Sequence, residues 1–189
     1  MVNPTKVNHS HPRGQSMAEF ALALPILLLV IFGLLEVGRA VFMYAAVVNA
    51  SREAVRYATA YGVDESDVLH VQNCAEIRNT AKRVAFLLPL ADENIEIKYD
   101  TGPEFVDPDE SATGDEYYDP PTDVGSCDPG ENVDESIVLA CGDRVTVTVT
   151  VNYNPIVPIV PMQAQPFSSS SARTYLGIVE LSDTPAACK

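Results

Sequence analysis

The sequence has few histidines, few basic residues and none of the short motifs that carry common enzyme chemistry. Of its 189 residues, 12 are Lys or Arg, 26 are Asp or Glu and three are His. It contains no Gly-rich phosphate loop, no nucleophile elbow and no cluster of metal-ligating histidines. His70 is the one histidine beyond the first eleven residues, and we expect it on a solvated surface. We therefore expect no enzymatic activity, no cofactor and no metal.

The shortage of basic residues also limits the partners. The formal net charge is -14. A surface of this sign repels nucleic acid and anionic lipid headgroups, and the sequence shows no basic patch that could bind either. We expect no nucleic-acid partner. The region beyond the N-terminal apolar segment, residues 62–189, is long enough for one small domain.

One long apolar segment dominates the N-terminal quarter. Residues 1–14 form a leader that carries Lys6 and Arg13 and no acid, and residues 15–61 are predicted to form one helix. About 20 apolar residues cross the hydrocarbon core of a bilayer, so we place the membrane-spanning part at about 18–39. Basic residues before the helix and acidic residues beyond it place the N-terminus in the cytoplasm and the domain outside.

The alternative interpretation is a cleaved secretory signal peptide. Such a peptide has an apolar stretch of about 7 to 15 residues followed by a small-residue cleavage site. Here the uncharged run from Phe20 to Leu35 spans 16 residues, and no Ala-x-Ala site ends it. Ala21-Leu22-Ala23 lies at its beginning, where a cut would leave the apolar segment on the mature chain. A retained membrane helix is therefore favoured.

A single acid stands near the start of this apolar segment. Glu19 lies five positions after Gly14, at the end of the basic leader. A carboxylate at the centre of a bilayer costs about 2.5 to 3.5 kcal/mol on insertion scales. We expect that such a costly residue has a function.

The stretch from Arg13 to Ala58 contains several motifs in a fixed order: Gly14, Glu19-Phe20, Pro25 inside the apolar run, Glu36 with Gly38, and the closing Ala50-Ser51-Arg52-Glu53-Ala54-Val55-Arg56-Tyr57. In this order and spacing they resemble the TadE-like family, the minor pilins or pseudopilins of the tight-adherence (Tad) pilus. The major pilins of this system usually have Tyr after the Glu and are very short, so Phe20 and the long C-terminal region favour a minor subunit.

This resemblance implies a processing site and an assembly role. A prepilin peptidase would cut after Gly14, Gln15 would become the new N-terminus, and Glu19 with Phe20 would act in assembly, Glu19 by pairing with the amine of a neighbouring subunit. Pro25 removes one helix hydrogen bond and should kink the helix locally. The implied partners are the peptidase, other pilins and pseudopilins, the pilus assembly platform and the membrane.

The implied location is the cytoplasmic (inner) membrane, crossed once, with incorporation into an extracellular type IVb/Flp pilus. The implied function is that of a structural or assembly subunit. The alternative function is a membrane-anchored extracytoplasmic binding or adhesion module with no role in a filament. Cleavage after the leader distinguishes the two, because a plain signal anchor keeps its leader.

The outer half of the helix carries charges and small residues. Glu36 and Arg39 are three apart and can pair on one helix face near the membrane interface, either with a specific role or as a plain interfacial ion pair. The domain should pack on an apolar stripe of this helix, which consists of Val41, Ala45, Val48, Val55 and Ala58. A second row on the helix consists of small residues: Ala46, Ala50, Ala54 and Ala58. These alanines either allow close approach of another helix or reflect helix propensity alone.

Beyond the helix we predict an α+β, pilin-like domain with an antiparallel sheet of about three strands packed on the helix. A second helix should run from Cys74 to Leu88 and end before Pro89. The predicted strands are residues 95–99, 144–153 and 168–181. The strict alternation of the middle one is the clearest, with these residues facing inward: Val145, Val147, Val149, Val151 and Tyr153.

Two segments are predicted to be loops. Residues 101–136 hold 12 of the 26 acids and no Lys or Arg, which favours a solvated acidic loop. A calcium site is the alternative, although Ala112 stands where an EF-hand loop needs Gly. Residues 154–166 have proline every third position, typical of polyproline II, as a docking site or a stiff connection. The four candidate calcium ligands are Asp107, Asp109, Asp115 and Glu116.

The sequence has four cysteines, all on the outward side of the membrane segment. An even count in an oxidising compartment predicts two disulfides, with three possible pairings. Cys127 and Cys141 flank a short loop and are the first expected pair, which leaves Cys74 with Cys188. Their spacing matches no Cys-x-x-Cys metal motif, so zinc is not expected.

Overall fold

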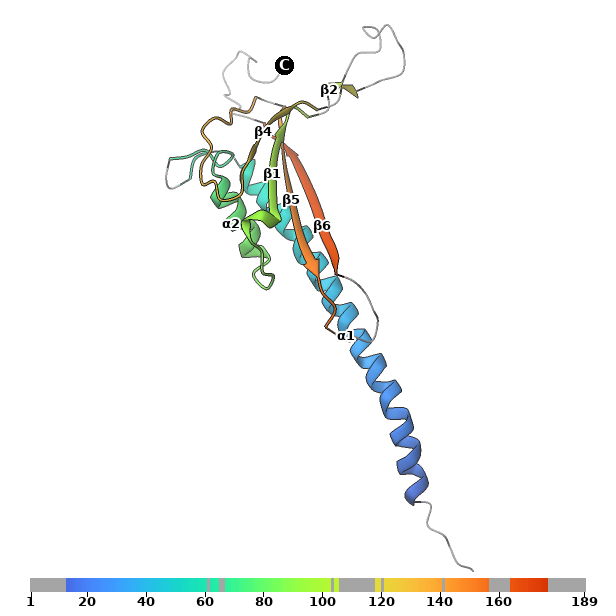
Figure 1. Cartoon of the computed structure of the whole chain (residues 1–189). Helices are drawn as coiled ribbons and strands as arrows, with labels where there is room; N and C mark the ends of the chain where they lie inside the picture. Colours follow the sequence, from blue (N-terminus) through green and yellow to red (C-terminus); the bar gives the residue numbers. More distant parts are fainter. Residues whose placement is uncertain are drawn as a thin grey trace, which may run out of the picture.

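The computed structural model describes residues 13–60, 62–64, 67–102, 104–105, 118–119, 121–140, 142–156 and 164–176. One long helix, α1 (Arg13–Ala58), carries a small α+β domain on its C-terminal half (Figure 1). The N-terminal half of α1 projects from the domain as a bare stalk. The predicted fold class, a long N-terminal helix continuing into a small α+β domain, is confirmed.

The domain is built on a four-stranded antiparallel sheet. Its strands lie in the order β4-β1-β5-β6, and each neighbouring pair is antiparallel. A separate pair of two-residue strands, β2 and β3, is also antiparallel. The strands are β1 (Ile95–Asp100), β2 (Glu104–Phe105), β3 (Tyr118–Asp119), β4 (Asp123–Cys127), β5 (Arg144–Tyr153) and β6 (Gln165–Thr174).

The prediction that residues 101–136 form only a loop is wrong where β2, β3 and β4 lie. β4 pairs with β1, with Ile97 opposite Cys127 and Tyr99 opposite Gly125. Its sequence, Asp-Val-Gly-Ser-Cys, has no apolar alternation, and only Cys127 is buried. Main-chain pairing to a well-formed neighbour places β4 in the sheet, and no local sequence pattern reports such pairing.

The alternation of β5 is confirmed and explains the core. Its inward residues, from Val145 to Tyr153, are all at most 5% exposed, and its Thr and Asn residues face outward. Ile95, Ile97 and Tyr99 of β1 lie on the same inward face and are also buried. One face of the sheet is therefore apolar and needs a cover, because successive side chains of a strand point to opposite faces.

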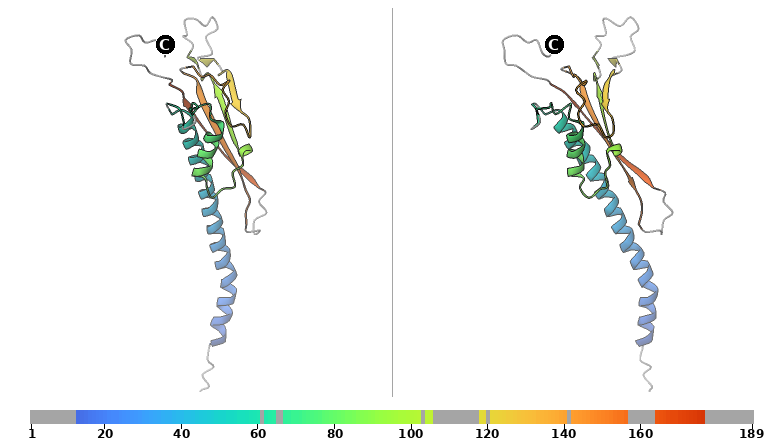
Figure 2. Two further views of the ribbon diagram at one scale, coloured as in Figure 1. Left: turned by 90° about the vertical axis from the view of Figure 1, so that its left-hand side faces the viewer. Right: turned by 60° about the vertical axis from the view of Figure 1, so that its left-hand side comes forward.

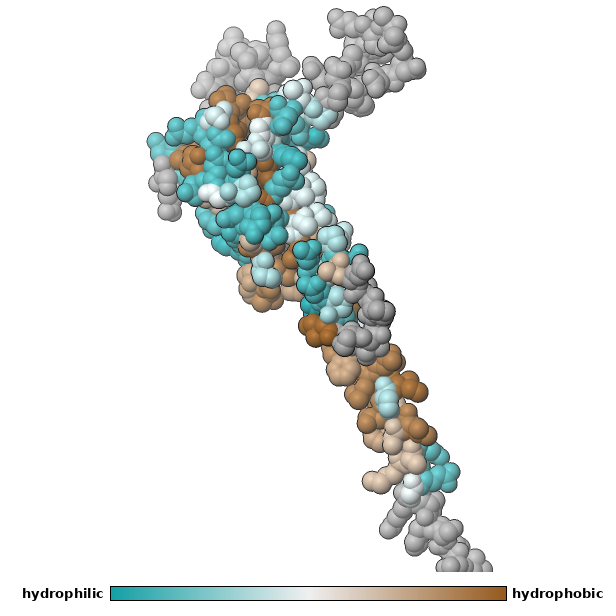
Figure 3. Space-filling model, in the orientation of Figure 1, coloured by the Kyte–Doolittle hydropathy of each residue, from teal (hydrophilic) through white to brown (hydrophobic). Residues whose placement is uncertain are grey.

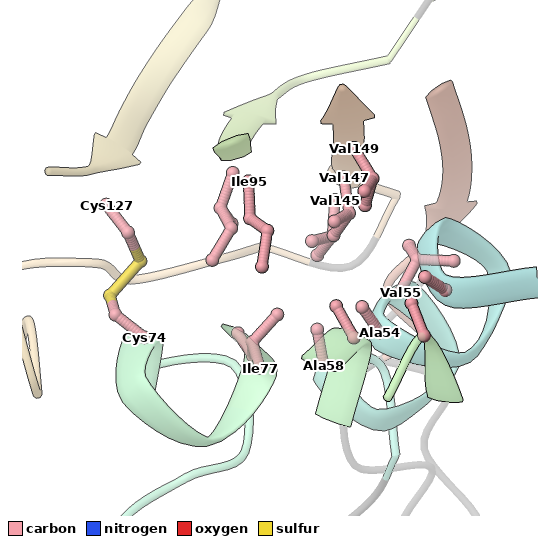
Figure 4. Close-up of a cluster of buried hydrophobic side chains, with 14 of the residues drawn as sticks. Ala54, Val55, Ala58, Cys74, Ile77, Ile95, Cys127, Val145, Val147 and Val149 are labelled. Atoms are coloured by element: carbon pink, nitrogen blue, oxygen red, sulfur yellow. A yellow bond between two sulfur atoms is a disulfide. The ribbon is translucent and has the colours of Figure 1, made fainter. Parts of the chain in front are cut away.

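Two helices cover this apolar face. α1 contacts β5 and β6, and α2 (Cys74–Val84) packs against α1 and reaches β1 (Figure 2). A short 3-10 helix, η1 (Asp92–Asn94), leads into β1. Figure 4 shows the β5 valines pointing toward Ala54, Val55 and Ala58 of α1, with Ile77 of α2 beside them.

The apolar stripe predicted on α1 is only half right. Val55 and Ala58 are buried, whereas Val41 and Ala45 are exposed and Val48 is half-buried. In the alanine row, Ala50, Ala54 and Ala58 are fully buried and Ala46 is half-buried. The buried apolar residues of this half of α1 are Met43, Val47, Ala50, Ala54, Val55 and Ala58. The small side chains of α1 let the sheet and α2 pack closely against the helix backbone. The larger side chains of the strands fill the core between them.

Some predicted boundaries differ from the observed ones. α1 ends at Ala58, and α2 ends at Val84, before the predicted end at Leu88. β6 begins at Gln165, three residues early, because its register with β5 continues to Tyr153 opposite Gln165. Pro166 is tolerated there because β6 is an edge strand. β6 ends at Thr174, so the predicted continuation of this strand is wrong at Tyr175 and Leu176, which lie outside it. Residues 177–181, with the predicted end at Leu181, and most of the predicted polyproline segment lie outside the described residues.

Candidate functional site

The N-terminal half of α1 exposes a continuous apolar surface. Large side chains from Met17 to Val37 point outward, and Leu22 is 77% exposed (Figure 3). Within the part of the chain that the structure describes, Gly14–Ala58 is the one helix long and apolar enough to cross a membrane. None of its most apolar 18-residue stretch is buried, unlike the core helix of a soluble protein. Such a surface needs an apolar environment, so the helix is compatible with a single-pass membrane anchor.

Among the described residues, no contact requires a glycine at position 14. It lies in the first turn of α1, and its φ angle is not positive. A Cβ atom added there would have no heavy atom within 4 Å beyond its own helix turn and chain neighbours. A glycine in a helix is less favourable than alanine by up to about 1 kcal/mol. The fold therefore gives no reason for glycine at this position.

Glu19 lies one helical turn after Gln15, on the exposed stalk. The side-chain amide of Gln15 donates a hydrogen bond to Glu19 Oε1 at 3.2 Å. The structure thus places the predicted new N-terminus and the predicted assembly acid on the same helix face. Phe20 is 63% exposed, and α1 continues through Pro25 as one element. The kink at Pro25 stays a prediction.

Glu36 is the centre of the junction between α1 and the domain. Its Oε1 atom accepts a hydrogen bond from Arg39 Nη2 at 2.7 Å and another from the Tyr153 hydroxyl. The backbone N–H of Ile156 donates to the same oxygen at 3.3 Å. The Tyr153 hydroxyl also lies 3.3 Å from the Glu36 carbonyl oxygen. One carboxylate therefore links the helix to the end of β5 and to the chain that follows it.

Arg39 completes this junction. Its Nη2 also donates to the Asn154 carbonyl, and its guanidinium carbon lies 4.7 Å from the centre of the Tyr153 ring. Charge-assisted hydrogen bonds and a cation–π contact both favour this arrangement. The Tyr153 ring stacks on Phe167 of β6 at 5.2 Å, and Phe167 contacts Tyr44 of α1 edge-on.

The predicted pairing of Glu36 with Arg39 is present, but it is not a plain helix-surface ion pair. The Glu36 side chain is 19% exposed, and its partners come from both the helix and the sheet. The sequence could report only the spacing of the two charges. Tyr153 was the one available signal, since the alternation of β5 predicts that it faces inward. The position of this pair at a membrane interface stays a prediction.

The predicted disulfide pairing is wrong. Cys74 bonds to Cys127, with their Cα atoms 5.8 Å apart, and both residues are buried. β4 ends at Cys127, directly opposite the first residue of α2, so the tertiary structure brings together two cysteines 53 residues apart. Sequence proximity had favoured Cys141 instead. Cys141 and Cys188 lie outside the described residues.

Two buried polar side chains surround this disulfide. The Tyr99 hydroxyl donates to the Val71 carbonyl at 2.8 Å, and burial raises the pKa of Tyr99 far above its usual value. Arg78 is 1% exposed and donates to the carbonyl oxygens of Cys127 and Glu131, at 2.9 and 2.8 Å. Arg78 therefore holds the loop after β4 against α2, because a buried guanidinium needs hydrogen-bond partners.

His70 does not lie on an open solvated surface. It is half-buried, its Nδ1 lies 3.0 Å from the Gly62 carbonyl oxygen, and its ring packs edge-on against Tyr57 at 4.7 Å. Among the described residues, no group of three or more His, Cys, Asp or Glu side chains is placed to hold a metal ion. The four acids weighed as calcium ligands lie outside those residues.

The comparison with protein families gives a match to most of α1. Residues 14–56 match the model of the family described as TadE-like protein. This segment of α1 is similar to TadE-like proteins. The match begins at Gly14 itself and includes Glu19, Glu36 and Arg39. It ends two residues before α1 does, so the domain lies outside it. No curated protein and no solved structure matches the chain.

The TadE-like resemblance seen in the sequence is thus confirmed. The match over residues 14–56 suggests a minor pilin-like protein associated with a Tad pilus, its other components and a membrane. The family is structural rather than enzymatic.

Proposed function

We propose that this chain is a minor pilin or pseudopilin of a Tad-type pilus, and that a prepilin peptidase cleaves it after Gly14. The observation that carries the proposal is the glycine itself. The folded chain makes no use of it, since a Cβ atom there would meet nothing beyond its own turn and neighbours. The TadE-like match starts at the same residue. Cleavage by a peptidase that accepts only glycine before the cut would explain why position 14 is a glycine.

After cleavage, Gln15 carries the free N-terminal amine. Glu19 lies one turn along the same helix, with its carboxylate within hydrogen-bond distance of Gln15. In an assembled filament, the carboxylate of one subunit pairs with the amine of its neighbour. This pairing compensates the cost of placing a carboxylate in an apolar environment. The chain crosses the cytoplasmic membrane once, with its domain outside, and is then incorporated into the pilus.

The junction at Glu36 supports a filament role. A subunit that packs through its helix must hold its domain at a defined angle to that helix. The contacts of Glu36 and Arg39 with Tyr153 and Asn154 join the two parts by hydrogen bonds, a cation–π contact and ring stacking. A binding module on a simple anchor has no need for this fixed orientation.

Substitutions at Gly14 test the processing step. Gly14→Leu should abolish maturation, and Gly14→Ala should reduce it, because the peptidase site has no room for a side chain. Gly33→Leu is the matched control, since Gly33 also has open space around it in the same helix. N-terminal sequencing of the protein from its native membrane measures the result. A mature Gln15 terminus in Gly14→Leu, or an uncut leader in the unaltered protein, would refute the proposal.

Glu19→Ala tests the assembly step separately. Removing a charge lowers the insertion cost, so membrane insertion should stay intact. Incorporation into sheared pili should fall strongly, because the amine of a neighbouring subunit then lacks its partner. Glu93→Ala, an exposed acid on the surface of the domain and outside α1, is the control. Normal recovery of Glu19→Ala in sheared pili would show that this carboxylate has no assembly role.

A further inference from the structure

An open groove beside α1 gathers arginines in a protein that is otherwise acidic. Arg52 and Arg56 line it from α1, Arg173 from β6 and Val84 from α2. We call it the arginine groove. Glu53 is the one acid that lines it. The chain as a whole carries 26 acids against 12 basic residues, so three arginines in one groove are a marked local excess.

Two of these arginine side chains have no hydrogen-bond or ion-pair partner among the described residues. Among the side chains that the structure describes, Arg52 and Arg173 make no hydrogen bond or ion pair. Arg56 lies 3.5 Å from Glu53, but both side chains are largely exposed, so this pair contributes little. Other basic side chains have close partners: Arg39 with Glu36, Lys82 with Asp92, Arg83 with Glu76, Lys98 with Glu96, Arg144 with Asp100, and Arg78 with backbone carbonyls.

The walls of the groove are held in place. Ser51, fully buried on α1, lies 2.9 Å from Ser171 and 3.2 Å from Ser169, oxygen to oxygen. These hydroxyl contacts fix β6 against α1 directly beside Arg173. β6 is an edge strand, and no described residue pairs with its outer side. The groove therefore presents guanidinium groups from a preformed surface next to an open strand edge.

The position of the groove argues for a protein partner. Arg52 follows Arg39 by 13 residues, which is about 20 Å along a helix. Screening limits the reach of surface charges to about 8 Å at physiological ionic strength. If the membrane span ends near Arg39, as the sequence predicts, lipid headgroups are too distant to neutralise Arg52. Nucleic acid is disfavoured by the net charge of -14.

We propose that the arginine groove binds an acidic segment of a neighbouring protein subunit. Guanidinium groups pair with carboxylates through two parallel hydrogen bonds, and Arg52 of α1 and Arg173 of β6 both provide such groups in the groove. The inference rests on the proposed pilus function, which supplies neighbouring subunits, and it adds the chemistry by which one of them is recognised.

Site-specific photo-crosslinking in the native cells tests this inference. A benzophenone amino acid replaces Ala172, an exposed residue that lines the groove, in the full chain. The test variant is Arg52→Gln with Arg173→Gln. The matched control is Lys82→Gln with Lys98→Gln, which removes the same charge outside the groove. Mass spectrometry identifies the crosslinked peptide and its yield.

The expected adduct joins this chain to a peptide of another subunit that is rich in Asp and Glu. Its yield should fall about fivefold or more in the arginine variant, as two lost surface charge contacts imply, and stay within about twofold in the control. A neutral or basic peptide, an adduct within the same chain, a phospholipid adduct, no adduct, or an equal yield in both variants would each overturn the inference.

Maturation measured in the same cells separates the two proposals. A Gln15 terminus without an acidic adduct overturns the arginine groove alone. An uncut leader in the unaltered chain overturns the pilus function, whatever the adducts show.

Discussion

The two halves of α1 have the same secondary structure and opposite surroundings. From Gly14 to Phe42 the helix carries its largest apolar side chains, and they are exposed. From Met43 to Ala58 the buried positions are mostly small, and the sheet and α2 cover them. The half that looks most like a hydrophobic core is therefore the half with no protein around it.

This difference shows how large and small side chains are distributed where α1 packs against the sheet. β5 and β1 bring Val, Ile and Tyr side chains, and the buried positions of α1 that face them include the small residues Ala50, Ser51, Ala54 and Ala58. The bare half must fill space against lipid or other helices by itself, and it uses Leu, Ile and Phe. The Glu36 junction lies where the two halves meet. Four predictions test this contrast, ordered by the size of the expected effect.

Removing the disulfide should cause the largest loss of stability in the covered half. Cys74→Ser with Cys127→Ser opens a link between residues 53 apart, and chain entropy predicts a loss of about 4 kcal/mol in the free energy of unfolding. Urea unfolding followed by tyrosine near-ultraviolet circular dichroism measures it, with membrane insertion unchanged. An unchanged midpoint, or a Cys127–Cys141 peptide in non-reducing mass mapping, would contradict the observed pairing.

A large residue on the alanine row should damage only the covered half. Ala50 is fully buried, so Ala50→Leu should overpack the contact and lower the unfolding free energy by about 1 to 3 kcal/mol. Ala23→Leu is the matched control on the exposed half and should leave the domain unchanged. Equal unfolding midpoints for the two variants would show that the alanines are there for helix propensity alone.

Tyr153→Phe should loosen the junction between α1 and the domain. It removes the hydroxyl that donates to Glu36 and keeps the ring stacked on Phe167. We expect a loss of about 1 kcal/mol in unfolding free energy, the usual net value of one hydrogen bond. Tyr44→Phe is the control, because the contact of Tyr44 with Phe167 uses its ring. Indistinguishable urea curves for the two variants would remove Tyr153 from the junction.

The smallest effect concerns pH and the domain surface. Lys82 Nζ donates to Asp92 at 2.7 Å, and this hydrogen bond lowers the pKa of Asp92 below its ordinary value. A lowered folded-state pKa stabilises the fold above the unfolded pKa, near 4, and this contribution is lost as pH falls through the folded pKa.

Lys82→Gln should therefore destabilise the domain at pH 7, by only about 0.5 kcal/mol because the pair is partly exposed. The difference should shrink as the pH falls below the unfolded pKa, near 4, and vanish once Asp92 is protonated in the folded state as well. Urea midpoints of both proteins between pH 2 and pH 7 test this. Arg52→Gln, which breaks no described ion pair, should show no such trend. A difference that persists at pH 2 would exclude the Asp92 contribution.

Patterns with a strong period were predictable from the sequence. The apolar run of α1, the helix beginning at Cys74 and the alternation from Arg144 to Tyr153 all appear in the structure. Strand β4 was not predictable, because main-chain pairing with β1 places it in the sheet. The arginine groove also lacks a sequence signal, since Arg52 and Arg173 meet only through the packing of β6 on α1.

The order of residues alone determined the anchor helix, its TadE-like segment and the α+β class, because these depend on local periodicity and contiguous spacing. The partners of Cys74, of Glu36 and of the alanine row depended on the folded arrangement. Each is a contact between segments far apart in the chain, and its energy comes from burial, hydrogen bonding and close packing in three dimensions. Such contacts exist only once the sheet has closed over α1, so no local pattern could report them.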